Sequence, residues 1–186
     1  MMQAATAPRL TVPVNERDHI LGPMTAPVTM VEYGDYECPY CGQAHHVIKQ
    51  LRQLMGHRLC FVFRHFPLTM IHPHAQDAAE AAEAAGAQGK FWEMHYLLFE
   101  HQNALERDHL VQYAAALGLD VSRFTGELIR HIHAPRVREH FMSGVRSGVN
   151  GTPTFFINGV RHNGSYDLDT LVDAIEAVMG AVSGHR

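Results

Sequence analysis

The feature that most constrains the fold is a strand–helix–strand pattern at residues 28–67. The run "VTMVEY" is rich in β-branched and apolar residues on both faces, as in a central strand that is covered on both sides. Helical spacing of apolar residues follows as far as Gly56, and "RLCFVFRHFP" then forms a second, nearly all-apolar run. A helix that connects two strands over this length predicts a βαβ unit with parallel strands.

The rest of the chain turns helical and then returns to strands. Ala-rich and amphipathic stretches predict an all-helical subdomain, in which Asp120 can cap a helix. The β-run "TPTFFING" ends in Asn158-Gly159, a strong signal for a hairpin turn, and an amphipathic helix follows it. The expected division is an N-terminal arm at 1–23, a βαβ half at 24–70, a helical insertion at 71–148, a ββα half at 149–180 and a tail at 181–186.

Composition argues against two classes of function. A net charge of -4 over 186 residues offers no basic surface for nucleic acid, and no apolar run is long enough to insert into a membrane. The N-terminal stretch lacks the charged start and the continuous apolar run of a secretory signal, and we expect a loose arm with a short edge strand at "HILG". The expected location is therefore cytoplasmic, or periplasmic if a signal has been removed.

Two of the three cysteines, Cys38 and Cys41, stand where the first strand passes into the helix. Their separation of three residues places both sulfurs on one helical face, close enough to form a disulfide. Backbone N–H groups at a helix start stabilise negative charge, so we expect a low pKa for Cys38, and Pro39 suits the first turn because its missing N–H costs nothing there. Cys38 would attack a disulfide and Cys41 would resolve the mixed disulfide, with no cofactor beyond the pair itself.

Two other interpretations of the pair stay open at this point. The pair could be half of a zinc site, although no second Cys-x-x-Cys exists and His45 and His46 lie further along the same helix. It could also be a purely structural disulfide, although the loop it closes is too short to stabilise the chain much. The rival to an enzyme is a peptide- or metal-binding module with a non-catalytic dithiol.

The motifs "EYGDYECPYC" and "GTPTFFING", separated by a helical insertion, resemble the thioredoxin superfamily and specifically its DsbA-like branch. The resemblance implies an α/β thioredoxin-like fold, in which a central mixed sheet is flanked by helices and carries an inserted all-helical subdomain. It also implies a thiol–disulfide oxidoreductase. The substrates would be protein or peptide disulfides and dithiols, a separate redox partner would recycle the pair, and the direction of electron flow is left open.

The resemblance also implies a substrate-binding set made of Pro39, Tyr40, Thr152 and Pro153. Pro153 matches the cis-proline of the family, packed against the active-site sulfurs, and Thr152 matches the residue whose backbone pairs with an incoming substrate. A proline cannot donate to a sheet ladder, which leaves an open edge beside the sulfurs. Tyr40 stands where strongly oxidising relatives carry histidine, so the reduction potential is open.

Three acidic residues lie close to the cysteine pair in sequence. Glu32 stands six residues before Cys38, where relatives carry a buried acid, and a buried carboxylate there would have a raised pKa and exchange a proton with Cys41. A glutamate at the rim, or one held in a salt bridge, fits the sequence equally well. Asp35 and Glu37 are expected to be exposed acids that flank the site.

Two other parts of the chain have weaker assignments. Cys60, in the apolar run "LCFVF", is expected to be a buried small apolar residue rather than a third reactive thiol. Met70 and Ile71, at the start of the helical insertion, are candidates to line an apolar substrate groove.

The 15 histidines follow no recognised metal-ligand spacing. We therefore expect no dedicated metal site, and most of the histidines should lie on the surface or between helices. Only the pairs His72 with His74 and His131 with His133 suggest adventitious metal binding.

Overall fold

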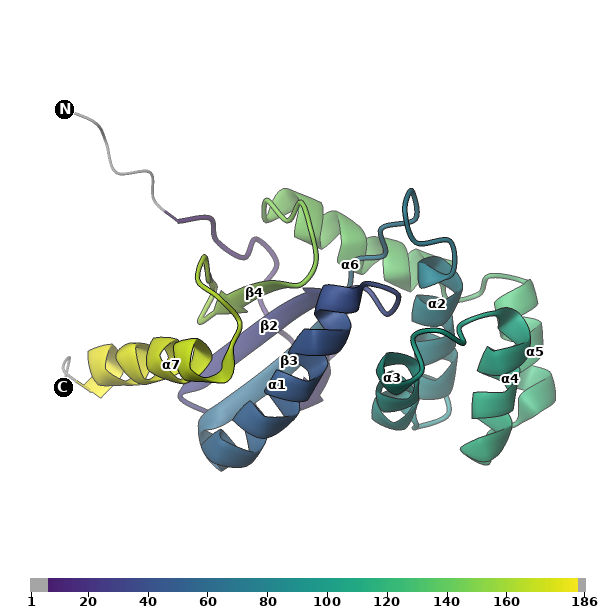
Figure 1. Cartoon of the computed structure of the whole chain (residues 1–186), viewed down its shortest axis with the longest axis horizontal. Coiled ribbons are helices and arrows are strands. Elements are labelled where there is room, and N and C mark those ends of the chain that lie inside the picture. The colour runs from purple at the N-terminus through teal and green to yellow at the C-terminus, as the bar shows by residue number, and fades with distance from the viewer. Residues whose placement is uncertain (1–6, 184–186) are drawn as a thin grey trace.

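The computed structural model describes residues 7–183, whose strands form one mixed five-stranded sheet in the order β1-β3-β2-β4-β5 (Figure 1). β2 lies at the centre and runs parallel to β3, whereas the other neighbouring pairs are antiparallel. The predicted βαβ unit is confirmed. The strands are β1 (His19–Leu21), β2 (Val28–Gly34), β3 (Leu59–His65), β4 (Thr154–Ile157) and β5 (Val160–Arg161).

Helices cover the sheet and also form a separate group beside it. Figure 1 shows α1 and α7 together at the sheet, with α2 to α5 gathered to one side of them. This arrangement confirms the expected fold class of a mixed sheet flanked by helices with a helical insertion. The helices are α1 (Pro39–Met55), α2 (Ala75–Gly86), α3 (Phe91–Glu100), α4 (Arg107–Ala116), α5 (Val121–Ile129), α6 (Ala134–Arg146) and α7 (Leu168–Ser183), with a short 3₁₀ turn at Gly56–Arg58.

The two faces of the sheet belong to two different cores. Met30 and Phe63 pack into a large core with apolar side chains of α1, α3 and α7, whereas Val31 and Val62 face a smaller core that includes Phe141 of α6. This alternation follows from the period of two in a strand, where successive side chains point to opposite faces. By the same period, the side chain of residue 32 points into the large core beneath α1.

Local signals set the ends of several elements. Asp120 caps α5, where its carboxylate accepts a hydrogen bond of 2.9 Å from the Arg123 N–H, as predicted. The hairpin between β4 and β5 turns at Asn158 and Gly159, which have φ angles of 45° and 78°, and these positive values suit the Asn-Gly pair. In the described residues, no helix has both the length and the apolar character needed to cross a bilayer.

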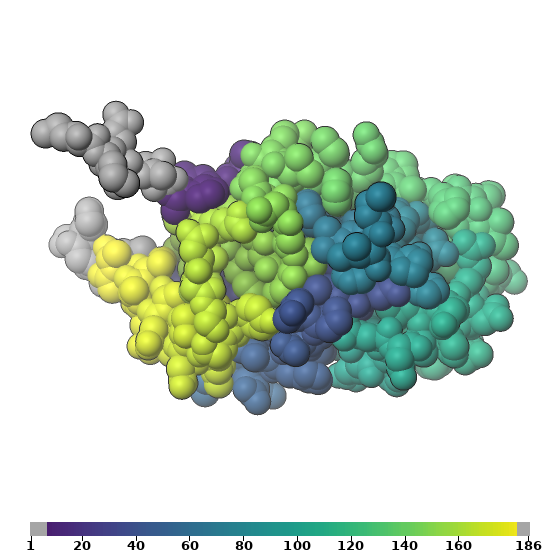
Figure 2. All heavy atoms as spheres, turned by 45° about the horizontal axis from the view of Figure 1, so that its top comes forward, coloured from purple at the N-terminus to yellow at the C-terminus, as the bar shows by residue number. Residues whose placement is uncertain are grey.

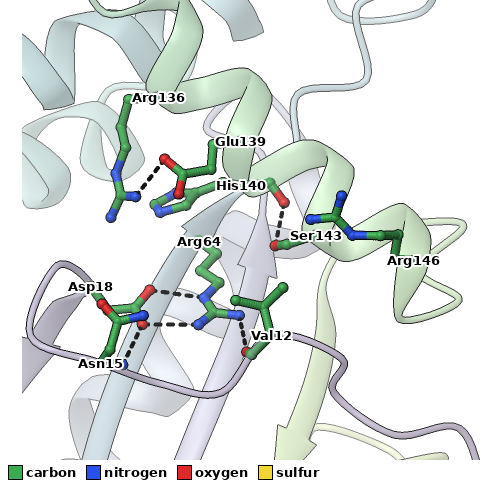
Figure 3. Close-up of a pocket in the computed structure, with 9 residues that line it drawn as sticks. All are labelled: Val12, Asn15, Asp18, Arg64, Arg136, Glu139, His140, Ser143 and Arg146. Carbon is green, nitrogen blue, oxygen red and sulfur yellow. Dashed lines mark hydrogen bonds and ion pairs between the residues drawn. The ribbon is translucent and has the colours of Figure 1, made fainter.

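The expectation of a loose N-terminal arm is wrong for residues 7–23. The buried guanidinium of Arg64 binds the Asp18 carboxylate at 2.8 and 2.9 Å and the Val12 carbonyl at 2.9 Å, which fastens this segment to β3 (Figure 3). The expected edge strand is present as β1, antiparallel to β3. At the other end, α7 continues to Ser183, so the expected tail is helical at 181–183, and residues 1–6 and 184–186 lie outside the described residues.

Candidate active site

The turn between β2 and α1 places the two cysteines at the start of the helix. Cys38 is the N-cap residue of α1 and Pro39 follows within its first turn, which needs no N–H at that point. Cys41 lies one turn in and is fully buried, and all three cysteines of the chain are free thiols. In Figure 2 the indigo start of α1 lies between the yellow-green segment that precedes α7 and the blue loop that precedes α2.

The sulfur of Cys38 is surrounded by hydrogen-bond donors. The Cys41 thiol donates to it, and this bond, together with the backbone N–H groups of Cys41 and Tyr40, lowers the pKa of Cys38 from 9.0 to about 5 against the opposing effect of burial. The buried Thr152 hydroxyl has no hydrogen-bond partner elsewhere, and its position near the Cys38 sulfur lowers the pKa of Cys38 further. Cys38 is therefore ionised at neutral pH, as a nucleophilic thiol should be.

Cys41 and Glu32 lie in the opposite environment. Burial raises the pKa of Cys41 well above 9.0, and the hydrogen bond that it donates to Cys38 adds to the rise. Glu32 is also buried, which raises the pKa of its carboxyl from 4.5 to about 8, with a further contribution from the charge of Cys38. Its Oε1 atom has no hydrogen-bond partner. Of the two interpretations of Glu32, the structure has the buried one, and both groups hold their protons at neutral pH.

The Thr152–Pro153 step folds back against the cysteine pair. Its peptide bond is cis, and the Thr152 carbonyl lies 3.4 Å from the Cys38 sulfur, close enough to accept a hydrogen bond from the thiol. β4 pairs with β2 only from Thr154 onward, so Thr152 and Pro153 precede the ladder. A segment about 114 residues away in sequence thus supplies an unpaired backbone edge beside the reactive sulfur.

The expectation that Asp35 and Glu37 are exposed is wrong. The Asp35 carboxylate is buried and accepts hydrogen bonds of 2.8 Å from the backbone N–H of Leu68 and 2.7 Å from His72. Glu37 is partly buried and accepts bonds of 2.7 and 2.8 Å from the backbone and ring of His74. These acids therefore hold the loop before α2 against the cysteine turn, because their partners lie more than 30 residues further along the chain.

Gln102 is a site residue that the sequence did not indicate. It lies between α3 and α4, and its amide donates to the carbonyl oxygens of Tyr36 and Cys38 at 2.9 and 2.8 Å. A Cβ atom at Gly42 would overlap the Gln102 amide, so the glycine is what lets the helical insertion reach the cysteine turn. A single glutamine in a turn between helices leaves no periodic signal, and only its position in the fold identifies it.

The surface beside Cys38 carries exposed apolar side chains. Tyr40 is 62% exposed, and Met70 and Ile71, on the loop held by Asp35, are 95% and 68% exposed. Large apolar side chains are usually buried, so each of these three is a candidate for contact with a partner chain.

The remaining predicted residues lie away from this chemistry. Cys60 is buried in the smaller core, as expected. The histidines that suggested adventitious metal binding each face a carboxylate instead. These pairs are His72 with Asp35, His74 with Glu37, His131 with Glu80 and His133 with Glu127.

A family model described as thioredoxin matches residues 14–177. The chain belongs to the thioredoxin family. The match includes both cysteines of the pair and the Thr152–Pro153 step, so the DsbA-like resemblance seen in the sequence motifs is confirmed at the level of family and fold.

Curated relatives of this thioredoxin-family chain are proteins named as sodium/proton antiporters. "Na(+)/H(+) antiporter NhaA 1" of Salinispora arenicola is 52% identical over 178 residues, which cover 95% of this chain and 27% of the relative. The protein of the same name from Mycobacterium sp. strain KMS is 48% identical over 166 residues, covering 87% of this chain and 27% of the relative. The chain thus spans about a quarter of the length of the curated relatives that it matches.

Several solved structures have a similar fold. BdbD from Bacillus subtilis superposes with a TM-score of 0.81 at 22% identity, covering 94% of this chain and 98% of BdbD. A thioredoxin-like oxidoreductase from Silicibacter pomeroyi gives 0.77 at 27% identity, covering 89% and 94%. The alpha-DsbA1 protein of Wolbachia pipientis gives 0.77 at 22% identity, covering 92% and 95%.

Proposed function

We propose that this protein is a thiol–disulfide oxidoreductase that acts on protein or peptide thiols through Cys38 and Cys41. The observation that carries the proposal is the opposite tuning of two adjacent thiols. Cys38 has a pKa lowered to about 5, whereas the pKa of Cys41 is raised well above 9.0. Such a pair has one reactive thiolate and one protonated thiol that can resolve the mixed disulfide, which is what disulfide exchange requires.

The low pKa of Cys38 favours oxidation of substrates as the direction. A stabilised Cys38 thiolate stabilises the reduced pair, which makes the disulfide form a stronger oxidant. A substrate thiolate attacks the Cys38 sulfur of the oxidised pair, and Cys41 leaves and takes up a proton. A second substrate thiolate then attacks the substrate sulfur of the mixed disulfide, so the substrate disulfide forms and Cys38 leaves as a thiolate. Two electrons pass to the pair, and a separate disulfide-bearing redox partner reoxidises it.

Glu32 is suited to supply the proton that Cys41 needs as a leaving group. With a pKa of about 8, its carboxyl is protonated at neutral pH, and its Oε1 atom is committed to no other hydrogen bond. In the reverse direction its ionised form accepts the Cys41 proton. Glu32 is thus proposed as the general acid and base of the resolving step.

The substrate would bind along the edge formed by Thr152 and Pro153. An extended peptide that pairs with the Thr152 backbone comes within reach of the Cys38 sulfur, 3.4 Å from the Thr152 carbonyl. Tyr40 and Pro39 are exposed beside this edge and would contact residues that flank the substrate cysteine. A backbone edge with an apolar border selects an accessible, extended segment rather than one particular sequence.

A matched pair of cysteine variants tests the proposal. Cys38→Ser should lower the rate of disulfide formation in a reduced, unfolded model protein to that of the glutathione redox buffer alone, and Cys60→Ala should keep the wild-type rate. Both variants should show the far-ultraviolet circular dichroism of the wild type, which excludes misfolding as the cause. Equal rates for the two variants would refute the assignment of Cys38 as the nucleophile.

A further inference from the structure

Three potential metal ligands from distant parts of the chain meet in one buried cluster. His19 of β1, His65 of β3 and Glu83 of α2 each offer one ligand atom, and these atoms lie within 4.8 Å of one another. The Nε2 atoms of the two rings lie 2.7 and 2.8 Å from the same oxygen, Oε1 of Glu83. This cluster was not predictable from the sequence, because its members are 18 to 64 residues apart and follow no local motif.

The three side chains are fixed by packing. The His19 ring stacks on Phe91 with a centroid distance of 3.4 Å and an interplanar angle of 3°, and the His65 ring stacks on His140 at 5.3 Å. His65 and Glu83 are buried, whereas the His19 side chain keeps 17% of its surface exposed. The cluster is therefore preorganised on two strands and a helix, and it opens to solvent on the His19 side.

Two members of the cluster lie in surroundings that shift their pKa values. Hydrogen bonds from His19 and His65 hold the pKa of Glu83 well below its usual range, despite the opposing effect of burial, so the carboxylate is ionised. Burial lowers the pKa of His65, which keeps that ring neutral. The nearby charge of Arg136 also lowers the pKa of His65 and opposes an added cation, but Glu139 pairs with Arg136 at 2.9 Å.

A single hydrogen bond fixes the tautomer of His65. In the metal-free protein its Nε2–H donates to Glu83, and its Nδ1 atom is buried with no hydrogen-bond partner. The bond to Glu83 is therefore the one hydrogen bond that fixes the ring proton on Nε2. When Nε2 takes a metal, the ring proton moves to Nδ1 without breaking another bond.

We propose that His19, His65 and Glu83 bind one Zn²⁺ ion, with water in the fourth position on the exposed side of His19. Two imidazoles and a carboxylate are a common zinc ligand set, and three protein ligands with a water are a common zinc geometry. The nitrogen–oxygen separations would open from 2.7 and 2.8 Å to about 3.3 Å, the separation set by metal–ligand bonds of about 2.0 Å in a tetrahedral site. The edge strand β1, only three residues long, can make this shift.

The ion would fasten the helical insertion to the sheet. Glu83 belongs to the insertion, whereas His19 and His65 belong to the two strands at one side of the sheet. A ligand that binds only the folded state raises its stability, by about 2.7 kcal/mol when the free ion is at 100 times its dissociation constant. This inference does not depend on the thiol chemistry, since neither Cys38 nor Cys41 is in the ligand set.

Calorimetric titration of ZnCl₂ into the full chain tests the site. The titrated protein carries Cys38→Ser and Cys41→Ser, so that the dithiol cannot bind the ion, and no histidine tag. We expect one Zn²⁺ per chain and a higher melting temperature with the ion than without it. Cobalt(II) in place of zinc should give the visible bands of a four-coordinate site without a sulfur charge-transfer band.

Two further variants of the same protein separate a built site from surface binding. His19→Ala, at the exposed edge of the cluster, should weaken Zn²⁺ binding at least 10-fold and abolish the rise in melting temperature. The control is His133→Ala, because His133 also faces a carboxylate, Glu127, at 2.7 Å and is equally exposed, but it belongs to no group of three potential ligands among the described residues. The control should bind like its parent. The proposal would be overturned if His19→Ala and His133→Ala bound Zn²⁺ with the same weak affinity, or if both lost Zn²⁺ binding equally. It would also be overturned if the parent protein held an adventitious ion only.

Discussion

Removing the hydrogen bond that Cys41 donates to Cys38 is the sharpest perturbation of the site, because this bond is the largest cause of the low pKa of Cys38. Cys41→Ala deletes the donor, whereas Cys41→Ser replaces the thiol with a hydroxyl that still donates. A hydrogen bond to a charged group contributes about 1.5–3 kcal/mol, and one pKa unit corresponds to about 1.4 kcal/mol. The pKa of Cys38 should therefore rise from about 5 by about one to two units in Cys41→Ala and by less in Cys41→Ser.

The assay is the ultraviolet absorbance of the Cys38 thiolate as a function of pH. A Cys60→Ala background leaves Cys38 as the one thiol in both variants, so the titration belongs to a single group. Rates of alkylation by iodoacetamide over the same pH range give an independent midpoint. The reasoning is refuted if the alanine and serine variants titrate together, or if the protein with both active-site cysteines shows a Cys38 midpoint near 9.

Three further predictions concern stability, each measured by denaturant unfolding of the protein with its thiols reduced. Gly42→Ala and Gln102→Ala should each lower the free energy of unfolding by about 1–2 kcal/mol. The double variant should lose no more than either single one, because both changes remove the same two hydrogen bonds, and additive losses would contradict this shared contact. Because folding raises the pKa of Glu32, its protonated carboxyl contributes to the free energy of unfolding. This contribution is full below pH 4.5 and is lost as pH rises through about 8. Wild type should therefore lose about 3 kcal/mol between pH 5 and pH 8 relative to Glu32→Gln, and parallel pH profiles would contradict this. Asp18→Ala should lower the free energy of unfolding by about 3–5 kcal/mol, because it leaves the charge of Arg64 buried and unpaired. The control is Glu139→Ala, which removes an exposed partner and should lower it by about 1 kcal/mol or less. Similar losses in the two variants would exclude a special role for the buried pair.

The parts of the molecule that were predictable from sequence are those with a local signal. A run of β-branched and apolar residues identified the central strand, and Asn158-Gly159 identified the hairpin turn. The spacing of Cys38 and Cys41 identified the reactive turn, because helix geometry alone brings residues three apart to one face. Each of these signals lies within a few residues of the structure that it specifies.

Polar contacts between distant elements were not predictable in this way. Asp35 looked like an exposed loop acid, since its partners Leu68 and His72 come from a loop whose position depends on the packing of the whole insertion. Arg64 stands in an otherwise apolar strand, and nothing near it in sequence shows that Asp18 neutralises it. Gln102 is the clearest case, because its bonds to backbone carbonyls require no particular residue type in the partner.

The reduction potential of the Cys38–Cys41 pair, measured at pH 7 against glutathione buffers, tests the central claim most directly. Thioredoxin has a nucleophile pKa of about 7 and a potential of about −270 mV. Lowering that pKa to about 5 stabilises the reduced pair by about a further 2.3 kcal/mol at pH 7, or about 50 mV. We therefore predict a potential of about −220 mV, and a value at or below that of thioredoxin would contradict the role of the low Cys38 pKa.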